Sequence, residues 1–201
     1  MDVQLESPNP PVNVLEGYVT QQETRLIVTC HDRVFEKVTV TDGDKKPLFR
    51  IEGTKWGTSW SWRRKAFDAN GNNHLFDFRH ESVSLKNNWV IEDPSGRKLA
   101  SLVHKSQVTS EHSAINATVR TITGEDVLVQ MRQHDRAALM TTISTGDTPI
   151  ASIQKVIDNT KARKSGVVQT VWDVRVAAGV DLSMILMLAL CRAEMAHVWK
   201  Q

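Results

Sequence analysis

The sequence predicts a mainly β protein, an antiparallel barrel of about twelve strands that encloses a hydrophobic C-terminal α-helix. Three observations lead to this prediction. The last segment, about 180–199, is apolar on nearly every side. The region before it, about 25–177, reads as short strands separated by turn residues. Eight strands already close into a barrel that side chains fill, so about twelve would leave a lumen for the helix.

The C-terminal segment is a helix that has to be buried all round, because it lacks a polar face. Asp181 and Ser183 suit its first turn, while Arg192 and His197 lie toward the negative end of its dipole. Its uncharged stretch, 182–191, is about half of the ~20 apolar residues that a bilayer crossing needs. We therefore predict no transmembrane span, and a shell of protein around the helix.

The first 22 residues contain Pro8, Pro10 and Pro11 among polar residues, a composition typical of an extended and poorly packed segment. We predict a mobile N-terminal segment over 1–22 and a single domain over 23–201. With 40% hydrophobic and 24% charged residues, the chain has the composition of an ordinary folded domain with a sizeable core.

Turn residues recur through the strand-rich region at a steady spacing. Glycines in turn dipeptides lie 22 to 28 residues apart, which is enough for two strands and two connections each. These dipeptides are Asp42-Gly43, Asn70-Gly71, Ser95-Gly96, Thr123-Gly124 and Thr145-Gly146. The expected strands are about 25–30, 37–42, 47–53, 60–67, 74–80, 86–92, 98–104, 115–121, 127–133, 138–144, 150–157 and 167–177. A helix about 10–12 Å across is a suitable plug for a barrel of this many strands.

The cysteines and the N-terminus indicate where the protein works. Cys30 falls in an apolar strand and Cys191 in the buried helix, and no basic-then-apolar signal segment opens the chain. These features predict a reducing, intracellular and cytoplasmic setting.

Three stretches resemble a known family. The run 174–186, which leads into the helix, resembles the end of the LURP-one-related family, and 89–93 and 67–72 resemble its repeated strand, turn and strand units. That family is similar in fold to the tubby C-terminal domain and to phospholipid scramblases. The resemblance covers about 20–199. It implies a twelve-stranded tubby-like barrel around a C-terminal helix and no established catalytic residues.

No motif in the chain spells out a reaction. Its seven histidines lack HExxH spacing, and the sequence contains no CxxC pair, GxSxG elbow, phosphate-binding loop or GxGxxG run. We therefore expect no catalytic residues, no metal and no cofactor. An enzyme whose site is assembled from distant residues is the less favoured alternative.

Two basic clusters are the candidate sites for lipid binding. Tryptophans at 56, 60 and 62 run into the first cluster, and the second occupies an expected loop. Aromatic side chains beside cations suit a membrane interface, although core tryptophans beside solvated cations would give the same pattern. The candidate residues are Arg63, Arg64, Lys65, Lys161, Arg163 and Lys164.

These observations favour peripheral binding to an anionic phospholipid surface, because tubby-like domains are associated with phosphoinositides. A protein-interaction module in stress or defence signalling is the alternative that the family resemblance implies. Scramblase-like lipid handling is disfavoured by the charged end of the helix. A net charge of +2 without a broad basic stripe argues against nucleic acid.

Overall fold

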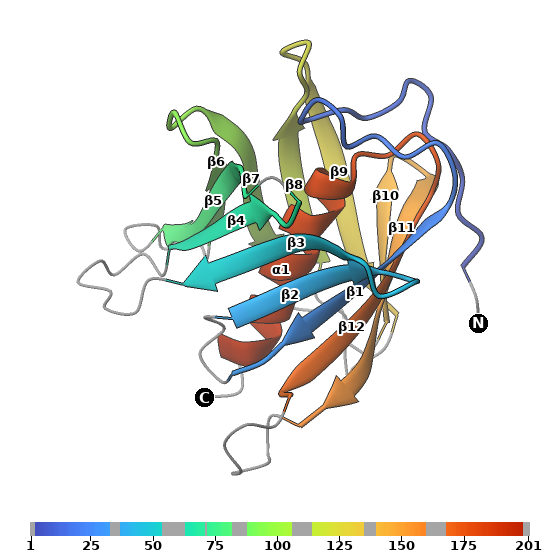
Figure 1. Ribbon diagram of the computed structural model, residues 1–201. Coiled ribbons are helices and arrows are strands. Elements are labelled where there is room, and N and C mark those ends of the chain that lie inside the picture. Colours follow the sequence, from blue (N-terminus) through green and yellow to red (C-terminus); the bar gives the residue numbers. More distant parts are fainter. Residues whose placement is uncertain are drawn as a thin grey trace.

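The computed structural model describes residues 3–32, 37–53, 63–70, 72–81, 88–105, 114–134, 140–159 and 168–198 (Figure 1). Within these residues twelve strands precede one helix. The strands are β1 (Thr24–Cys30), β2 (Lys37–Asp42), β3 (Pro47–Gly53), β4 (Arg64–Asp68), β5 (His74–Glu81), β6 (Asn88–Glu92), β7 (Lys98–Lys105), β8 (Ala114–Arg120), β9 (Asp126–Gln133), β10 (Met140–Thr145), β11 (Thr148–Asp158) and β12 (Thr170–Val176). The helix is α1 (Leu182–Val198).

The strands form one closed antiparallel barrel. Each strand pairs with its neighbours in the sequence, and β1 closes the ring by pairing with β12 from Thr24↔Val176 to Cys30↔Thr170. The predicted twelve-stranded barrel is therefore confirmed. Strand bounds differ from the expected ones by a few residues; the expected strand 60–67, for example, is β4, and 60–62 lie outside the described residues.

α1 is the core of the barrel, as its apolar surface predicted. Met184 to Cys191 are all buried, and the inward side chains of the strands pack around them. β12 shows the pattern clearly, since Trp172, Val174 and Val176 are buried while the residues between them are partly exposed. A helix at the centre of a closed sheet has no solvent-facing side, which explains why its sequence is not amphipathic.

Asp181 caps this helix and is fully buried. Its Oδ1 accepts hydrogen bonds from Ser183 N at 2.7 Å, Ser183 Oγ at 2.5 Å and Met184 N at 3.2 Å. Its Oδ2 accepts from Val14 N and Leu15 N, both at 2.7 Å. The carboxylate thus satisfies free N–H groups of the helix and joins the helix to the N-terminal segment.

The prediction that residues 1–22 are poorly packed is wrong for the part that the structure describes. Val12 and Val14 are buried in the core, and Val12 forms a bridge with Val180. Thr20 N also donates to Val180 O at 3.1 Å. The physical reason is that the apolar start of α1 needs a cover at this end of the barrel, and a segment rich in proline can supply one without helix or sheet.

The turns are built on aspartates as much as on glycines. Of the glycines in the expected turn dipeptides, Gly96, Gly124 and Gly146 have positive φ, but Gly43 does not; in its turn Lys45 has positive φ, 66°. Asp42 Oδ1 accepts from the N–H groups of residues 44 and 46, and Asp93 Oδ1 accepts from those of 95 and 97. These Asx turns stabilise hairpins without needing glycine at a fixed place.

Candidate functional site

The order of the strands gives the barrel two unlike ends. Connections after even-numbered strands, together with the start of α1, lie at one end and are two to five residues long; we call it the short-turn end. Connections after odd-numbered strands are six to eleven residues long and lie at the other end, which we call the long-connection end. α1 runs toward the long-connection end, where Arg192 Nε lies 3.3 Å from Thr141 Oγ1 near the start of β10.

The two ends of the barrel differ in formal charge. The six connections of the long-connection end carry eight Lys or Arg and four Asp or Glu, a formal charge of +4. The five connections of the short-turn end carry three against four, and residues 3–23, which cover that end, add three Glu and no Lys or Arg. The short-turn end therefore has a formal charge of −4. The small net charge of the whole chain conceals this polarity.

The first predicted cluster does not form a common surface. Arg63 precedes β4, and its Nη1 lies 2.9 Å from Asp77 Oδ2. Arg64 faces the barrel interior and is only 3% exposed, whereas Lys65, the next residue, is exposed on the outer face. Alternation along β4 separates the two side chains. The second predicted cluster, 161 to 164, and the tryptophans at 56, 60 and 62 lie outside the described residues.

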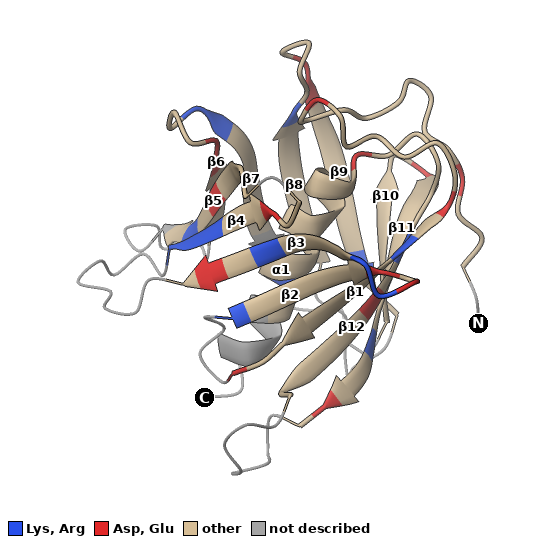
Figure 2. Cartoon of the chain, in the orientation of Figure 1, with Lys and Arg blue, Asp and Glu red and all other residues tan. Residues whose placement is uncertain are grey.

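Lys65 belongs to a row of charges that crosses five strands on the outer face. The register pairs Lys37 with Glu52, Glu52 with Lys65, Lys65 with Asp77, and Asp77 with Glu92. Figure 2 shows Lys and Arg along β2, β3 and β4 on this side of the molecule. The first three pairs join opposite charges, which stabilise the sheet modestly, whereas Asp77 and Glu92 carry the same charge. Within the described chain, the ammonium groups of Lys37 and Lys65 form no ion pair and are available to a partner.

An ion-pair network covers one part of this row. Arg63 contacts Asp77 and, at 3.3 Å, Glu92, while Arg79 contacts Glu92 at 2.8 Å. His74 Nε2 lies 2.7 Å from Asp77 Oδ1. The hydrogen bond from Arg79 holds the pKa of Glu92 below its usual value, although desolvation opposes this shift. With two guanidinium groups for two carboxylates, the network is balanced and serves to hold β4, β5 and β6 together.

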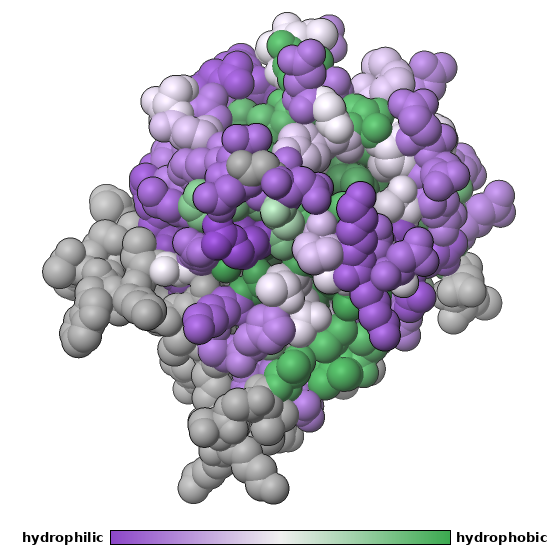
Figure 3. Space-filling view, in the orientation of Figure 1, coloured by the Kyte–Doolittle hydropathy of each residue, from purple (hydrophilic) through white to green (hydrophobic). Residues whose placement is uncertain are grey.

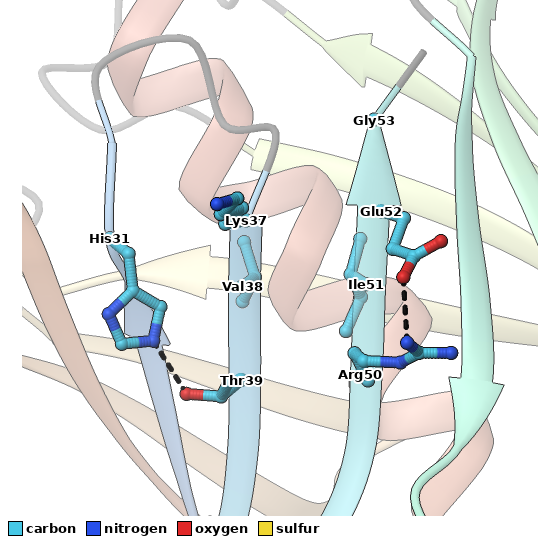
Figure 4. A pocket seen from close by; sticks show the side chains of 8 residues that line it. All are labelled: His31, Lys37, Val38, Thr39, Arg50, Ile51, Glu52 and Gly53. Carbon is cyan, nitrogen blue, oxygen red and sulfur yellow. Dashed lines mark hydrogen bonds and ion pairs between the residues drawn. The ribbon is translucent and has the colours of Figure 1, made fainter. Parts of the chain in front are cut away.

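A cavity of about 500 Å³ lies at the long-connection end of β1, β2 and β3 (Figure 4). Its described lining mixes apolar and polar side chains: Val38 and Ile51 are buried in the core, and Lys37 and Glu52 are exposed. The described lining residues are His31, Lys37, Val38, Thr39, Arg50, Ile51, Glu52 and Gly53.

The polar groups of this cavity are partly paired with one another. His31 Nε2 lies 2.8 Å from Thr39 Oγ1, and Arg50 Nη1 lies 2.7 Å from Glu52 Oε1. Arg50 is also stacked over the ring of Phe67, 5.0 Å from its centre. Among the described lining residues, Lys37 is thus the cation best placed to meet an anionic group. No sequence motif marks this cavity, because its described residues come from β2, β3 and His31 after β1, and the pairing of the strands brings them together.

A second cavity, of about 470 Å³, lies at the short-turn end between residues 8–13 and the β8–β9 turn. Proline, threonine and asparagine dominate its described lining, and Glu125 is the charged residue among them. This cavity is unsuited to an anion because it lacks a cation in the described lining.

Cations also lie inside the barrel near the end of α1. Arg64, Lys155 and Arg192 are buried there. Lys155 Nζ lies 3.0 Å from Asp158 Oδ2, and Arg192 donates to Thr141. The negative end of the helix dipole favours positive charge at this place. These cations have a structural role and are not exposed to a partner.

Two further observations limit the chemistry of the described residues. They contain no group of three or more His, Cys, Asp or Glu side chains that could hold a metal ion. The one helix of the described residues, α1, is not long and apolar enough to cross a membrane.

The comparisons with known proteins agree with this architecture. The LURP-one-related family model matches residues 24–193, which contain all twelve strands of the barrel and most of α1. The chain belongs to the LURP-one-related family. An X-ray structure of a protein from Arabidopsis thaliana is similar over 92% of this chain and 98% of its own, with a TM-score of 0.58 and 12% sequence identity. At 12% identity, this likeness is evidence for the fold of the chain and for nothing beyond the fold. No curated protein matches its sequence.

Proposed function

We propose that this LURP-one-related protein is a non-enzymatic binding protein that attaches peripherally to anionic phospholipid surfaces, including those that contain phosphoinositides. The observation that carries the proposal is the division of charge between the barrel ends. A formal charge of +4 at the long-connection end and −4 at the other orients the molecule toward a negative surface. The cavity at that end, with Lys37 in its lining, is the site that we propose for a phosphate-bearing headgroup.

The contributing residues come from both sequence-predicted clusters and from β2. Lys65 and Lys37 offer ammonium groups without ion pairs in the described chain. Lys161, Arg163 and Lys164 lie within the connection between β11 and β12, which belongs to the same end. Arg63 contributes less because it is held by Asp77, and Arg64 is buried.

The expected attraction is moderate. Each cation near an anionic membrane surface contributes about 1 kcal/mol, and screening acts over about 10 Å at 0.1 M salt. Four net charges therefore correspond to a dissociation constant of about 1 mM from electrostatics alone. Binding should weaken as salt rises, and tighter binding requires a headgroup in the cavity or an apolar contribution.

Co-sedimentation with vesicles tests the proposal. Wild-type protein is mixed with vesicles of phosphatidylcholine, alone or with phosphatidylserine or phosphatidylinositol bisphosphate. One variant carries Lys37→Glu and Lys65→Glu, and another carries Glu at 161, 163 and 164. The control matched to the first variant carries Lys45→Glu and Lys46→Glu, the same charge change as that variant in an exposed turn at the short-turn end.

We expect wild type and the control to bind anionic vesicles at low salt, and both other variants to bind at least several-fold more weakly. If wild type binds no anionic vesicle, the proposal is wrong and a protein partner becomes the better reading. If all four proteins bind equally, charge at the long-connection end does not direct the binding.

A further inference from the structure

An irregularity in β11 places two neighbouring β-branched side chains on the outside of the barrel. The register between β11 and β12 shifts after Lys155↔Trp172, and the next pair is Ile157↔Val171, so Val156 is an extra residue. Alternation would turn neighbouring side chains to opposite faces, but a bulge allows both to face the same way. Val156 is 49% exposed and Ile157 is 42% exposed, whereas Lys155 points inward.

Across the strands the neighbours of Ile157 are apolar or neutral, whereas along β11 the next residue is the exposed Asp158, which is paired with Lys155. Ile157 lies opposite Val171 on β12, and Val171 lies opposite Thr29 on β1; both of these residues are partly exposed. Figure 3 shows hydrophobic surface over the lower part of β12, toward the end of the barrel where β11 finishes. Single exposed apolar residues are common, but an adjacent pair with apolar neighbours indicates a contact surface.

The pair lies at the long-connection end, close to its positive charge. β11 ends one residue after Ile157, and the connection that follows carries three Lys or Arg and no acidic residue. On the other side, β12 and β1 separate the pair from Lys37 and the cavity on β2. The sequence therefore places three cations shortly after the pair and Asp158, and the structure places Lys37 on β2, beyond β12 and β1.

We propose that Val156 and Ile157 are an apolar anchor that enters the interface of an anionic bilayer while the long-connection end faces the membrane. This inference rests on the proposed function and names the surface that makes contact. Two side chains are too few for a stable protein interface, which buries more than about 1,000 Å². At a membrane, in contrast, a small apolar insertion and an electrostatic attraction that are each weak combine into useful binding.

The first test is a variant with Val156→Thr and Ile157→Thr, which keeps the β-branched shape and lowers the apolar surface. The matched control is Ile122→Thr, since Ile122 is 50% exposed at the short-turn end. On vesicles of phosphatidylcholine and phosphatidylserine, the double variant should bind about fivefold to tenfold more weakly than wild type. Its salt dependence should be unchanged because all charges remain. The control should bind like wild type.

The second test reports insertion directly. Ile157→Cys and Ile122→Cys are labelled separately with a fluorophore that responds to polarity; Cys30 and Cys191 are buried and should not react. With anionic vesicles, the label at 157 should shift to the blue and be quenched by lipids that carry a quencher in their acyl chains. The label at 122 should show neither change.

The outcomes separate this inference from the proposed function. If wild type binds anionic vesicles and the double variant binds equally well, the anchor is wrong and the electrostatic proposal stands. If wild type does not bind, both are wrong. If wild type forms dimers in size-exclusion chromatography and the double variant does not, the pair is a contact between copies of the chain, and the anchor is again wrong.

Discussion

At the scale of single residues, Asp181 joins the start of α1 to the N-terminal segment through five hydrogen bonds. Replacing it with Ala would leave five donors without their acceptor, two of them from Val14 and Leu15. Loss of a helix cap costs about 1 kcal/mol, and each buried unsatisfied donor costs about 1–3 kcal/mol. We expect Asp181→Ala to lower the free energy of unfolding by at least about 3 kcal/mol in urea denaturation. The exposed control, Asp44→Ala, should change it by less than about 0.5 kcal/mol.

Tyr18 provides a prediction about pH, because it is the single tyrosine of the chain. Burial, and then the charge of Asp68, raise its pKa from 10.0 to about 12, and its hydroxyl donates to Asp68 Oδ2 at 3.2 Å. A raised pKa favours the neutral form in the folded state. The stabilisation is therefore complete below pH 10 and is lost as pH rises toward 12.

Tyrosinate absorbance measures this titration directly. The folded protein should titrate with a midpoint of about 12, and the unfolded protein near 10. The variant Tyr18→Phe should lose less stability than wild type between these two values. A midpoint near 10 in the folded protein would show that the hydroxyl of Tyr18 is not held against Asp68.

At the same scale, the sequence alone did not predict the ion pairs of Arg63. The partners of Arg63 are 14 and 29 residues away, and only the register of β4, β5 and β6 brings Asp77 and Glu92 to it. A run of three cations looks like one basic surface in the sequence. In the strand, alternation sends Arg64 inward and Lys65 outward.

At the scale of elements, α1 determines whether the barrel has a core. Leu186 is fully buried in the second turn of the helix, and Leu128 is half exposed on β9. Leu186→Asp should lower stability by several kcal/mol, a large part of the about 5–15 kcal/mol of a typical domain. Leu128→Asp should cost no more than about 1 kcal/mol. Thermal melting followed by circular dichroism distinguishes them, and similar melting temperatures would mean that α1 is not central.

The elements themselves were largely visible in the sequence, for physical reasons. A helix without a polar face and repeated turn residues are local signals, and they predicted α1 and the twelve strands. The packing of residues 3–22 was not predicted, because Val12 and Val14 belong to a short apolar run that follows three prolines and shows no clear helix or strand pattern. Their role depends on the uncovered start of α1, which is distant in the sequence. The bulge at Val156 likewise appears only when β11 is paired with β12.

At the scale of the whole molecule, the polarity of the barrel predicts an orientation on the membrane. The N-terminal segment is held at the short-turn end, where Glu6 N donates to Pro149 O at 2.8 Å. α1 finishes toward the long-connection end, and Figure 1 shows the N-terminal segment and the end of α1 on different sides of the molecule. If the long-connection end faces the membrane, a folded domain fused after α1 comes between the protein and the lipid. A domain fused before residue 3 does not.

A compact folded domain joined by a short linker tests this orientation. Fused after residue 201, it should weaken binding to phosphatidylserine vesicles at least several-fold, because it holds the cations and the Val156 and Ile157 pair away from the surface. Fused before residue 1, it should leave binding almost unchanged. Both fusions should show the thermal transition of the unfused barrel, which excludes misfolding as the cause. Equal loss in both, or greater loss in the N-terminal fusion, would contradict the orientation even if the protein binds anionic lipid.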